Sequence, residues 1–202
     1  MSHYVKFTYQ RARADIAAFN ALAELNAIRR ELLELRLIGV DSNGIGFGNL
    51  SVRDGASRNF YITCSATGGL PELAPTDCVR VVAYDCAKNW LRYEGVAIPS
   101  SESLTHAAIY ESDSTISAVI HCHDSDLWAT LLDRAPTTSK AVAYGTPEMA
   151  YEIMRLFKGT DLQSRKILVM AGHEGGIATF GKNLEDAFDV VMRERRESSP
   201  CI

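Results

Sequence analysis

The sequence predicts an α/β protein built as a sandwich around a mixed or antiparallel sheet. Three observations carry this prediction. Apolar runs typical of strands mostly follow one another, helical patterns are interspersed irregularly, and Asp54-Gly55 marks a tight turn between two strand-like runs. A doubly wound parallel sheet would instead require strands and helices to alternate regularly along the chain.

The first half of the chain contains one helical pattern and four strand patterns. Apolar residues at three- and four-residue spacing predict a helix over residues 12–36, which ends before Gly39 and the turn sequence at 41–44. Two strands are expected on either side of the Asp54-Gly55 turn, and two more are joined by a short turn. These strands are expected over residues 49–53, 59–63, 79–84 and 90–93.

The second half alternates helices with apolar strands. Ser101, Asp124 (or Ser125) and Asn183 have side chains that can cap a helix, and Pro147 suits a first helical turn. The expected helices span residues 101–111, 124–132, 148–157 and 184–196, and the expected strands span 116–120, 167–171 and 176–180.

Length and composition favour one soluble domain over residues 1–202. The chain has 47% hydrophobic and 23% charged residues, and its net charge of −4 argues against a nucleic-acid partner. No apolar run is long enough to span a bilayer, so no membrane partner is expected. The five cysteines are odd in number and form no CxxC pair, and the first ten residues lack a signal-peptide core. We therefore expect reduced thiols and a cytoplasmic protein.

Three of the five histidines follow apolar runs. Side chains at i and i+2 of a strand share a face, so His121 and His123 should project together, with Cys122 turned away. His173 follows a second apolar run, and Glu102 supplies a carboxylate. The pattern favours a metal site over the alternative, ordinary polar residues at strand ends.

Several motifs together resemble the class II aldolase/adducin family over residues 21–191. They are the stretches at 48–53 (GNLSVR), 62–68 (ITCSATG), 99–102 (PSSE), 118–123 (AVIHCH), 144–148 (YGTPE) and 172–175 (GHEG). The resemblance implies a three-layer α/β/α sandwich with a central, mostly antiparallel sheet. It also implies a homo-oligomer, commonly a tetramer with active sites at subunit interfaces.

The resemblance also assigns roles to individual residues. His121, His123 and His173 correspond to three ligands of a divalent metal, usually Zn²⁺, with an open fourth position. Glu102 corresponds to the general acid/base, although a glutamate at a helix start could simply favour the helix dipole. Small and hydroxyl residues correspond to a phosphate-binding site, although in turns they could be ordinary loop residues. These are Gly48, Asn49, Thr67, Gly68, Ser100 and Ser101.

The implied function is a zinc-dependent lyase. It would cleave a small phosphorylated ketose by a retro-aldol step, through a metal-stabilised enediolate. The same site could serve a dehydratase, an epimerase or a decarboxylase. A different class is a non-catalytic, adducin-like interaction domain, although such domains tend to lack the metal histidines. A metal-bound regulatory or binding domain is a further alternative.

Some features depart from the family pattern or are only loosely placed. The segment between His123 and Tyr144 is short and contains no confident counterpart of the tyrosine that protonates the departing fragment in the better-known aldolases. Asp124 and Glu174 flank ligands and could orient their imidazoles. Residues 39–48 are glycine-rich and could form a flexible lid or a wide turn. Neither His3, near the terminus, nor His106, expected on the exposed side of its helix or capping its packing, is needed as a ligand.

Overall fold

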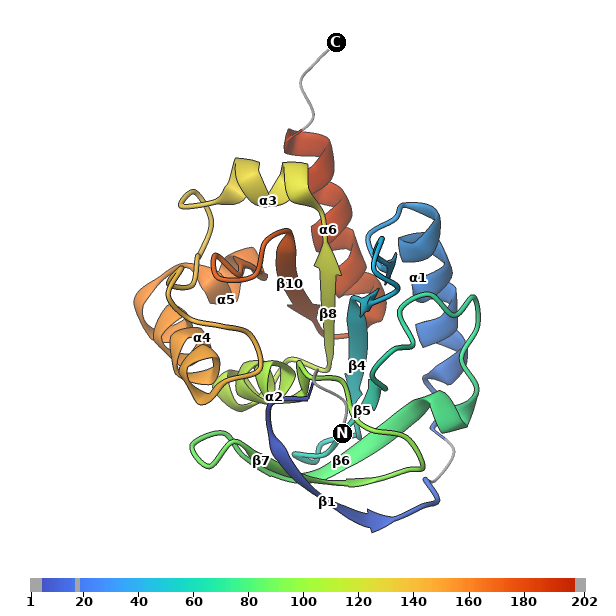
Figure 1. Ribbon diagram of the computed structural model, residues 1–202. Coiled ribbons are helices and arrows are strands. Elements are labelled where there is room, and N and C mark those ends of the chain that lie inside the picture. Colours follow the sequence, from blue (N-terminus) through green and yellow to red (C-terminus); the bar gives the residue numbers. More distant parts are fainter. Residues whose placement is uncertain (1–4, 17–18, 199–202) are drawn as a thin grey trace.

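The computed structural model describes residues 5–16 and 19–198, and its centre is an eight-stranded sheet (Figure 1). The strand order is β1-β7-β6-β5-β4-β8-β10-β9, and within the described residues every pair is antiparallel except β1 with β7. The predicted mostly antiparallel sheet is confirmed. The strands are β1 Thr8–Arg13, β4 Asn49–Arg53, β5 Phe60–Thr63, β6 Cys78–Asp85, β7 Trp90–Glu94, β8 Ala118–His123, β9 Ile167–Val169 and β10 Gly176–Gly181.

Helices cover both faces of this sheet. Buried residues of α2, α4 and α5 join an apolar cluster on one face, the α2-side cluster, whereas α1, α3 and α6 contribute to the α6-side cluster on the other. The layers are therefore helix, sheet and helix. The helices are α1 Leu22–Glu34, α2 Ser103–Ser112, α3 Ser125–Leu131, α4 Pro147–Gly159, α5 Leu162–Arg165 and α6 Leu184–Ser198, and a 3-10 turn, η1 Pro75–Asp77, precedes β6.

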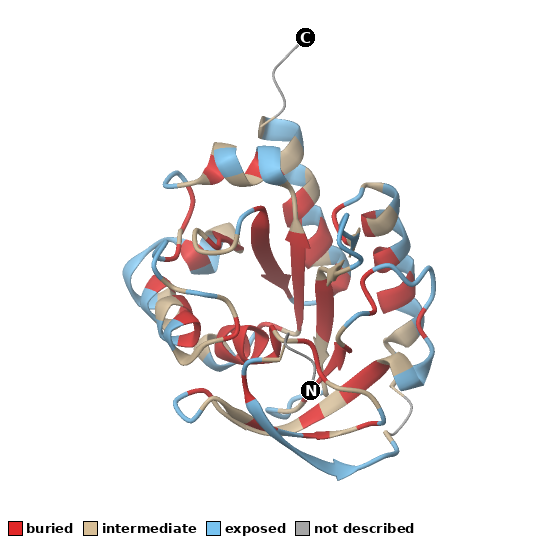
Figure 2. Ribbon diagram, in the orientation of Figure 1, coloured by how far each residue is buried: buried red, intermediate tan, exposed pale blue. Residues whose placement is uncertain are grey.

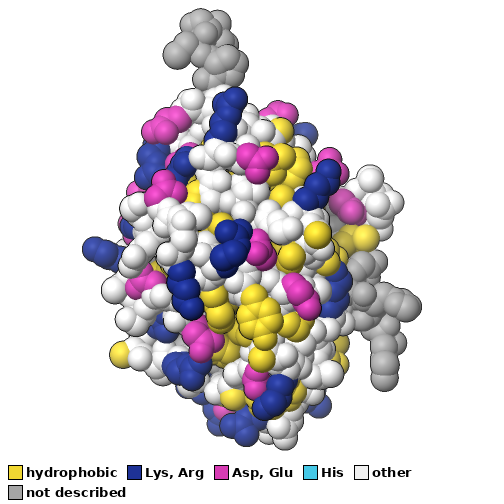
Figure 3. All heavy atoms as spheres, turned by 90° about the vertical axis from the view of Figure 1, so that its left-hand side faces the viewer, with side chains coloured by type: hydrophobic (Ala, Val, Ile, Leu, Met, Phe, Trp, Pro, Cys, Tyr) yellow, Lys and Arg dark blue, Asp and Glu magenta, His cyan; other side chains and the backbone are white. Residues whose placement is uncertain are grey.

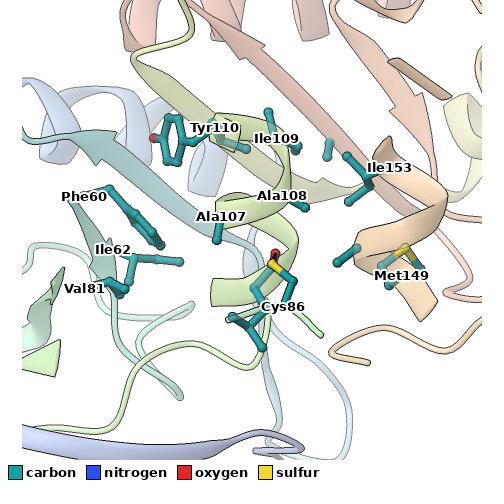
Figure 4. Packing of buried hydrophobic residues seen from close by; sticks show 14 of the residues in the cluster. Phe60, Ile62, Val81, Cys86, Ala107, Ala108, Ile109, Tyr110, Met149 and Ile153 are labelled. Carbon is teal, nitrogen blue, oxygen red and sulfur yellow. Dashed lines mark hydrogen bonds between the residues drawn. The ribbon is translucent and has the colours of Figure 1, made fainter. Parts of the chain in front are cut away.

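Strand β8 separates the two clusters by simple alternation. Val119 belongs to the α2-side cluster, whereas Ala118, Ile120 and Cys122 belong to the α6-side cluster. The strand is buried from Ala118 to Cys122, which Figure 2 shows in red, and His123 at its end is half-buried. Figure 4 shows how Ala107 and Tyr110 of α2 pack in the α2-side cluster. The even-numbered residues of β8 thus stabilise the sheet, and its odd-numbered histidines face the other side.

Capping side chains fix the starts of two helices, as the sequence predicted. Asp124 accepts a hydrogen bond from the Leu127 amide at 3.0 Å, and Asn183 accepts one from the Asp186 amide at 2.7 Å. Pro147 is the first residue of α4, as expected. Ser101 does not cap α2, because that helix begins two residues later, at Ser103, with Glu102 in the capping position.

The helix predicted over residues 12–36 is shorter than expected. Its first two residues, Ala12 and Arg13, belong to β1, an exposed edge strand that runs parallel to β7, and α1 begins only at Leu22. The apolar residue Phe19 fits the helical spacing but stacks on Tyr61, with 4.2 Å between the ring centroids. Pairing with a distant strand therefore overrides the local helical pattern.

The glycine-rich segment 39–48 forms a small hairpin. Strands β2 Gly39–Val40 and β3 Gly46–Phe47 pair antiparallel, and the Asp41 carboxylate accepts the amides of Asn43 and Ile45 at 2.8 Å each. Its own hydrogen bonds thus stabilise the segment as a two-stranded hairpin and not as an open turn.

The face of the molecule in Figure 3 carries charges of both signs, and the described cysteines are not paired. Within the described residues no helix is long and apolar enough to cross a membrane. On the side that carries α4, basic and acidic side chains are interspersed (Figure 3). Four cysteines are buried free thiols, namely Cys64, Cys78, Cys86 and Cys122, whereas Cys201, like His3, lies outside the described residues.

Gly48 connects β3 to β4 and tests how tightly the backbone is packed at this connection. Its φ is +78°, and a Cβ at this position would lie 2.3 Å from Cγ2 of the buried Ile38. Gly44 has nearly the same φ, +76°, but its Cβ would meet no atom within 4 Å. We expect Gly48→Ala to lower the free energy of unfolding by about 2 kcal/mol more than Gly44→Ala, because overpacking adds to the shared backbone cost. Urea unfolding of both variants measures the difference, and equal losses would contradict it.

Candidate metal centre

The turn between β9 and β10 brings His173 to the end of β8. Gly176 of β10 pairs with His123, so the residues just before Gly176 lie beside the end of that strand. Within the turn, the His173 amide donates to Met170 and the Gly176 amide donates to the His173 carbonyl, at 3.0 and 2.8 Å. A Cβ at Gly176 would lie 2.4 Å from the His173 ring, so this close approach requires glycine.

The three imidazoles converge. One ligand atom from each of His121, His123 and His173 lies within 4.8 Å of the other two. The Nε2 atoms of His123 and His173 are 2.8 Å apart, and the ring centroids of the three histidines are 4.6 to 5.3 Å apart. Three facing nitrogens at this separation match the ligand set of an open zinc site.

Backbone groups orient two of these rings. His121 Nδ1 lies 3.1 Å from the Ile177 carbonyl oxygen, which accepts its proton and leaves Nε2 unprotonated. The backbone of Glu174 contacts the His123 ring in the same way and raises its pKa slightly against a larger opposing effect of burial. The donor set therefore fits a divalent cation.

Burial keeps the histidines neutral. It lowers the pKa of His123 to about 4 and that of His173 to about 3, and repulsion from His123 and Lys6 lowers the pKa of His173 further. The pKa of His121 also falls well below the usual value, mainly by burial and then by repulsion from His123 and His173. Metals bind the neutral imidazole, so these nitrogens are ready to coordinate at neutral pH.

Glu102 is buried beside the histidines, at the start of α2. Its Oε2 accepts the Thr105 hydroxyl at 2.5 Å, and its Oε1 has no hydrogen-bond partner among the described residues. Burial raises the pKa of Glu102 to about 7, although the Thr105 bond and the charge of Lys6 oppose the shift. A carboxyl with this pKa can take up and release a proton near neutrality.

These groups line one cavity of about 400 Å³, a size suited to a small ligand. Five of the six residues predicted to bind phosphate also line it, namely Gly48, Asn49, Gly68, Ser100 and Ser101. Thr67 lies behind this wall, and its hydroxyl donates to the Cys64 carbonyl at 2.7 Å. Nine of the ten predicted site residues thus come together around one space.

A family profile matches most of this chain and identifies its family. The profile of the Class II Aldolase and Adducin N-terminal domain matches residues 41–193. The chain belongs to this family. A methylthioribulose-1-phosphate dehydratase of Leptospira biflexa serovar Patoc is 29% identical, over 69% of this chain and 78% of the relative.

Solved structures of the family have the same fold. An L-fuculose 1-phosphate aldolase superposes with a TM-score of 0.67 and 26% identity, covering 91% of this chain and 84% of its own. A sugar-phosphate aldolase from Thermotoga maritima gives a TM-score of 0.65 at 15% identity, with 88% and 91% covered. This family member therefore shares the predicted three-layer architecture.

Two carboxylates do not act as predicted. Asp124 caps α3 and forms an ion pair with Arg195 at 2.9 Å, and Glu174 is exposed. Backbone groups lie next to the imidazoles instead: the Ile177 carbonyl of β10 contacts His121, and the backbone of Glu174, in the turn before β10, contacts His123. The idea that these side chains orient the ligands is wrong for this family member.

His106 is buried, and the prediction that it lies on an exposed side is wrong. Its Nδ1 is 2.6 Å from Ser51 Oγ, which is 2.8 Å from the Tyr110 hydroxyl. Burial lowers the pKa of His106 to about 3. The reason is that α2 is buried on all sides from its first residue to Tyr110, so this helix has no exposed face there.

No feature of the sequence predicted that Lys6 would contact Tyr144, a residue that lines the cavity. Its ammonium lies 3.7 Å from the centroid of the Tyr144 ring and donates to the Tyr144 carbonyl at 3.1 Å. The Tyr144 ring is in turn 4.3 Å from that of His173. Lys6 approaches Tyr144 from the N-terminal segment that leads into β1.

Metal binding is the first test of the centre. Zinc should raise the free energy of unfolding of the chain by about 4 kcal/mol when free zinc exceeds its Kd about 1,000-fold. His173→Ala should lose this effect and the bound equivalent of zinc, whereas His106→Asn should keep both. Metal analysis after dialysis and chemical unfolding with and without zinc give the two readouts. Full zinc retention by His173→Ala would exclude it as a ligand.

The pKa of Glu102 predicts how stability depends on pH. Its folded-state pKa, about 7, lies above the unfolded value of 4.5, so in this window the folded state binds more protons and stability falls as pH rises. Relative to Glu102→Gln, the metal-free chain should lose about 3 kcal/mol between pH 4.5 and 7. Denaturant unfolding of both proteins across this range measures the difference, and parallel curves would contradict the shift.

Proposed function

We propose that this chain is a metal-dependent lyase that cleaves a small phosphorylated ketose by a retro-aldol step. One observation carries the proposal: three neutral imidazoles and a buried carboxyl with a pKa near 7 meet in one cavity. A regulatory metal site would need the imidazoles but has no use for a titratable carboxyl beside them. The three histidines equally argue against a non-catalytic interaction domain.

His121, His123 and His173 would hold the metal, which we take to be Zn²⁺, with another divalent cation as the alternative. The ion would supply a Lewis acid that polarises the ketone of the substrate. Because the protein provides three ligands, a coordination position remains for the substrate.

Glu102 would move the proton. Glu102 lines the cavity and its Oε1 has no hydrogen-bond partner among the described residues, so this carboxylate would accept the proton of the substrate hydroxyl next to the bond that breaks. The hydroxyl carbon leaves as an aldehyde, and the electron pair of the broken bond stays on the ketone fragment. Glu102 then returns the proton to carbon, which restores its starting state.

The phosphate would bind at the wall formed by Gly48, Asn49, Gly68, Ser100 and Ser101, with Thr67 behind it. Backbone amides and hydroxyls at such turns suit an anion. The names of two relatives, an L-fuculose 1-phosphate aldolase and a methylthioribulose-1-phosphate dehydratase, support a ketose 1-phosphate. We further propose a cytoplasmic homo-oligomer, a tetramer as is common in this family.

Dehydration is the second candidate, because the Leptospira relative is named a dehydratase. The same carboxyl would then take a proton from carbon next to the ketone, and a hydroxyl on the following carbon would leave as water. The two reactions differ in product: one yields an aldehyde and a shorter ketone, the other water and an unsaturated product of unchanged carbon number.

The test is a set of ketose 1-phosphates and the matching free ketoses, each incubated with zinc-loaded protein. Aldehyde release is scored by a coupled dehydrogenase, and loss of water by mass spectrometry of the product. Glu102→Gln should reduce kcat by about 10²- to 10⁴-fold, because proton transfer contributes on this scale, while zinc content stays unchanged.

Thr105→Val is the matched control for Glu102→Gln. It removes only the hydroxyl that donates to Oε2, so it should change the pH profile of kcat far more than its maximum. Activity of Glu102→Gln equal to that of the unsubstituted chain would exclude the carboxyl as the base. No turnover of any ketose by zinc-loaded protein would overturn the proposed function.

A further inference from the structure

Arg29 of α1 is an arginine with no exposed surface, and it lies behind the cavity wall. Its Nη2 donates to the carbonyl oxygens of Thr67 and Leu70 at 2.9 and 2.8 Å, and to that of Gly68 at 3.4 Å. One guanidinium nitrogen thus holds a whole turn of the loop whose Gly68 faces the cavity.

The charge of this guanidinium has no direct counter-ion. In the described part of the chain no carboxylate lies within ion-pair distance of Arg29, and its Nε and Nη1 have no hydrogen-bond partner. Asp77 raises the pKa of Arg29 only from beyond ion-pair distance. Its Oδ2 accepts a hydrogen bond from the Ala74 amide instead. A buried cation without a partner costs several kcal/mol, so its presence calls for an explanation.

The cavity in front of the loop lacks a cation of its own. None of the described residues that line it is lysine or arginine, and two, Asp41 and Glu102, are acids. A phosphorylated ligand would bring negative charge to a wall that otherwise offers backbone amides and hydroxyls. Arg29 contacts that wall from behind, through the carbonyls of Thr67 and Gly68.

We propose that Arg29 supplies the positive charge for a phosphate group bound at Gly68, acting through the loop. In a trans peptide the carbonyl and the next amide point in opposite directions. Hydrogen bonds that hold the carbonyls of Thr67 and Gly68 toward Arg29 therefore aim the amides of Gly68 and Gly69 away from it, toward the cavity side. The guanidinium also polarises these amides, which strengthens them as donors.

Arg29 is thus a positioning residue, and the bound anion is its counter-ion. The inference rests on the proposed phosphorylated substrate, and it explains how a site without a basic lining can select one. It also predicts that the free protein is strained electrostatically and that an anion relieves the strain. An unphosphorylated ketose would leave Arg29 uncompensated and bind more weakly.

The test is the affinity of the metal-free protein for inorganic phosphate, because without metal the anion cannot bind the histidine site through zinc. Arg29→Met should weaken binding about tenfold or more, which is about 1.4 kcal/mol. Arg30→Met is the matched control, since Arg30 is the exposed next residue of the same helix and carries the same charge. It should bind phosphate like the unsubstituted chain, as should Arg29→Lys to within about threefold, since it keeps the charge.

A second variant keeps the test decisive if Arg29→Met does not fold. Cys78 is buried and acts electrostatically on Arg29. Cys78→Asp would give the guanidinium a counter-ion within the protein, so it should weaken phosphate binding about tenfold while Arg29 stays in place. Phosphate affinity unchanged in a folded Arg29→Met or Cys78→Asp protein would overturn the inference and leave the proposed lyase intact.

The outcomes also separate the two proposals. If the unsubstituted protein binds no phosphate, the role of Arg29 fails, and turnover of free ketoses then decides the lyase reaction alone. If phosphate binds and depends on Arg29 but no ketose is turned over, the anion site stands and the proposed function fails.

Discussion

The pairing of β8 with β4 on one side and β10 on the other is the constraint on which the site depends. Asn49 lies opposite His121 in one ladder, and Gly176 lies opposite His123 in the other. A slip of one residue in either ladder would turn both histidines into the α6-side cluster and put Cys122 into the cavity. The apolar even-numbered residues of β8 prevent this slip, so the core specifies the site.

Burial then sets the charge state of the site. The same loss of water that raises the pKa of Glu102 lowers that of His173, so both tend toward neutral forms. The histidines of a cavity prepared in this way are neutral, and Glu102 Oε1 and Asn49 Oδ1 lack hydrogen-bond partners among the described residues. Such atoms are costly in a folded protein, and ligands that satisfy them bind with the advantage that this cost is removed.

The sequence revealed what is local and missed what depends on distant contacts. Strand alternation places His121 and His123 on one face, and the starts of α3, α4 and α6 follow from Asp124, Pro147 and Asn183 at or next to their first turns. His106 could not be placed, because its partner Ser51 comes from β4, 55 residues away. The edge strand β1 was missed for the same reason, since its pairing with β7 joins residues about 80 positions apart.

Close packing at Gly48 and Gly68 limits which groups this part of the cavity wall can carry. At Gly48 a Cβ would collide with Ile38, and at Gly68 it would lie 2.5 Å from the carbonyl oxygens of both Gly39 and Phe47. The wall is therefore made of closely packed backbone and cannot carry a basic side chain at these positions. Backbone amides give direction but only partial charge, so a guanidinium in the layer behind adds the full positive charge that these two positions lack. Arg29 occupies that layer, and its bonds to the loop carbonyls connect α1 to the cavity.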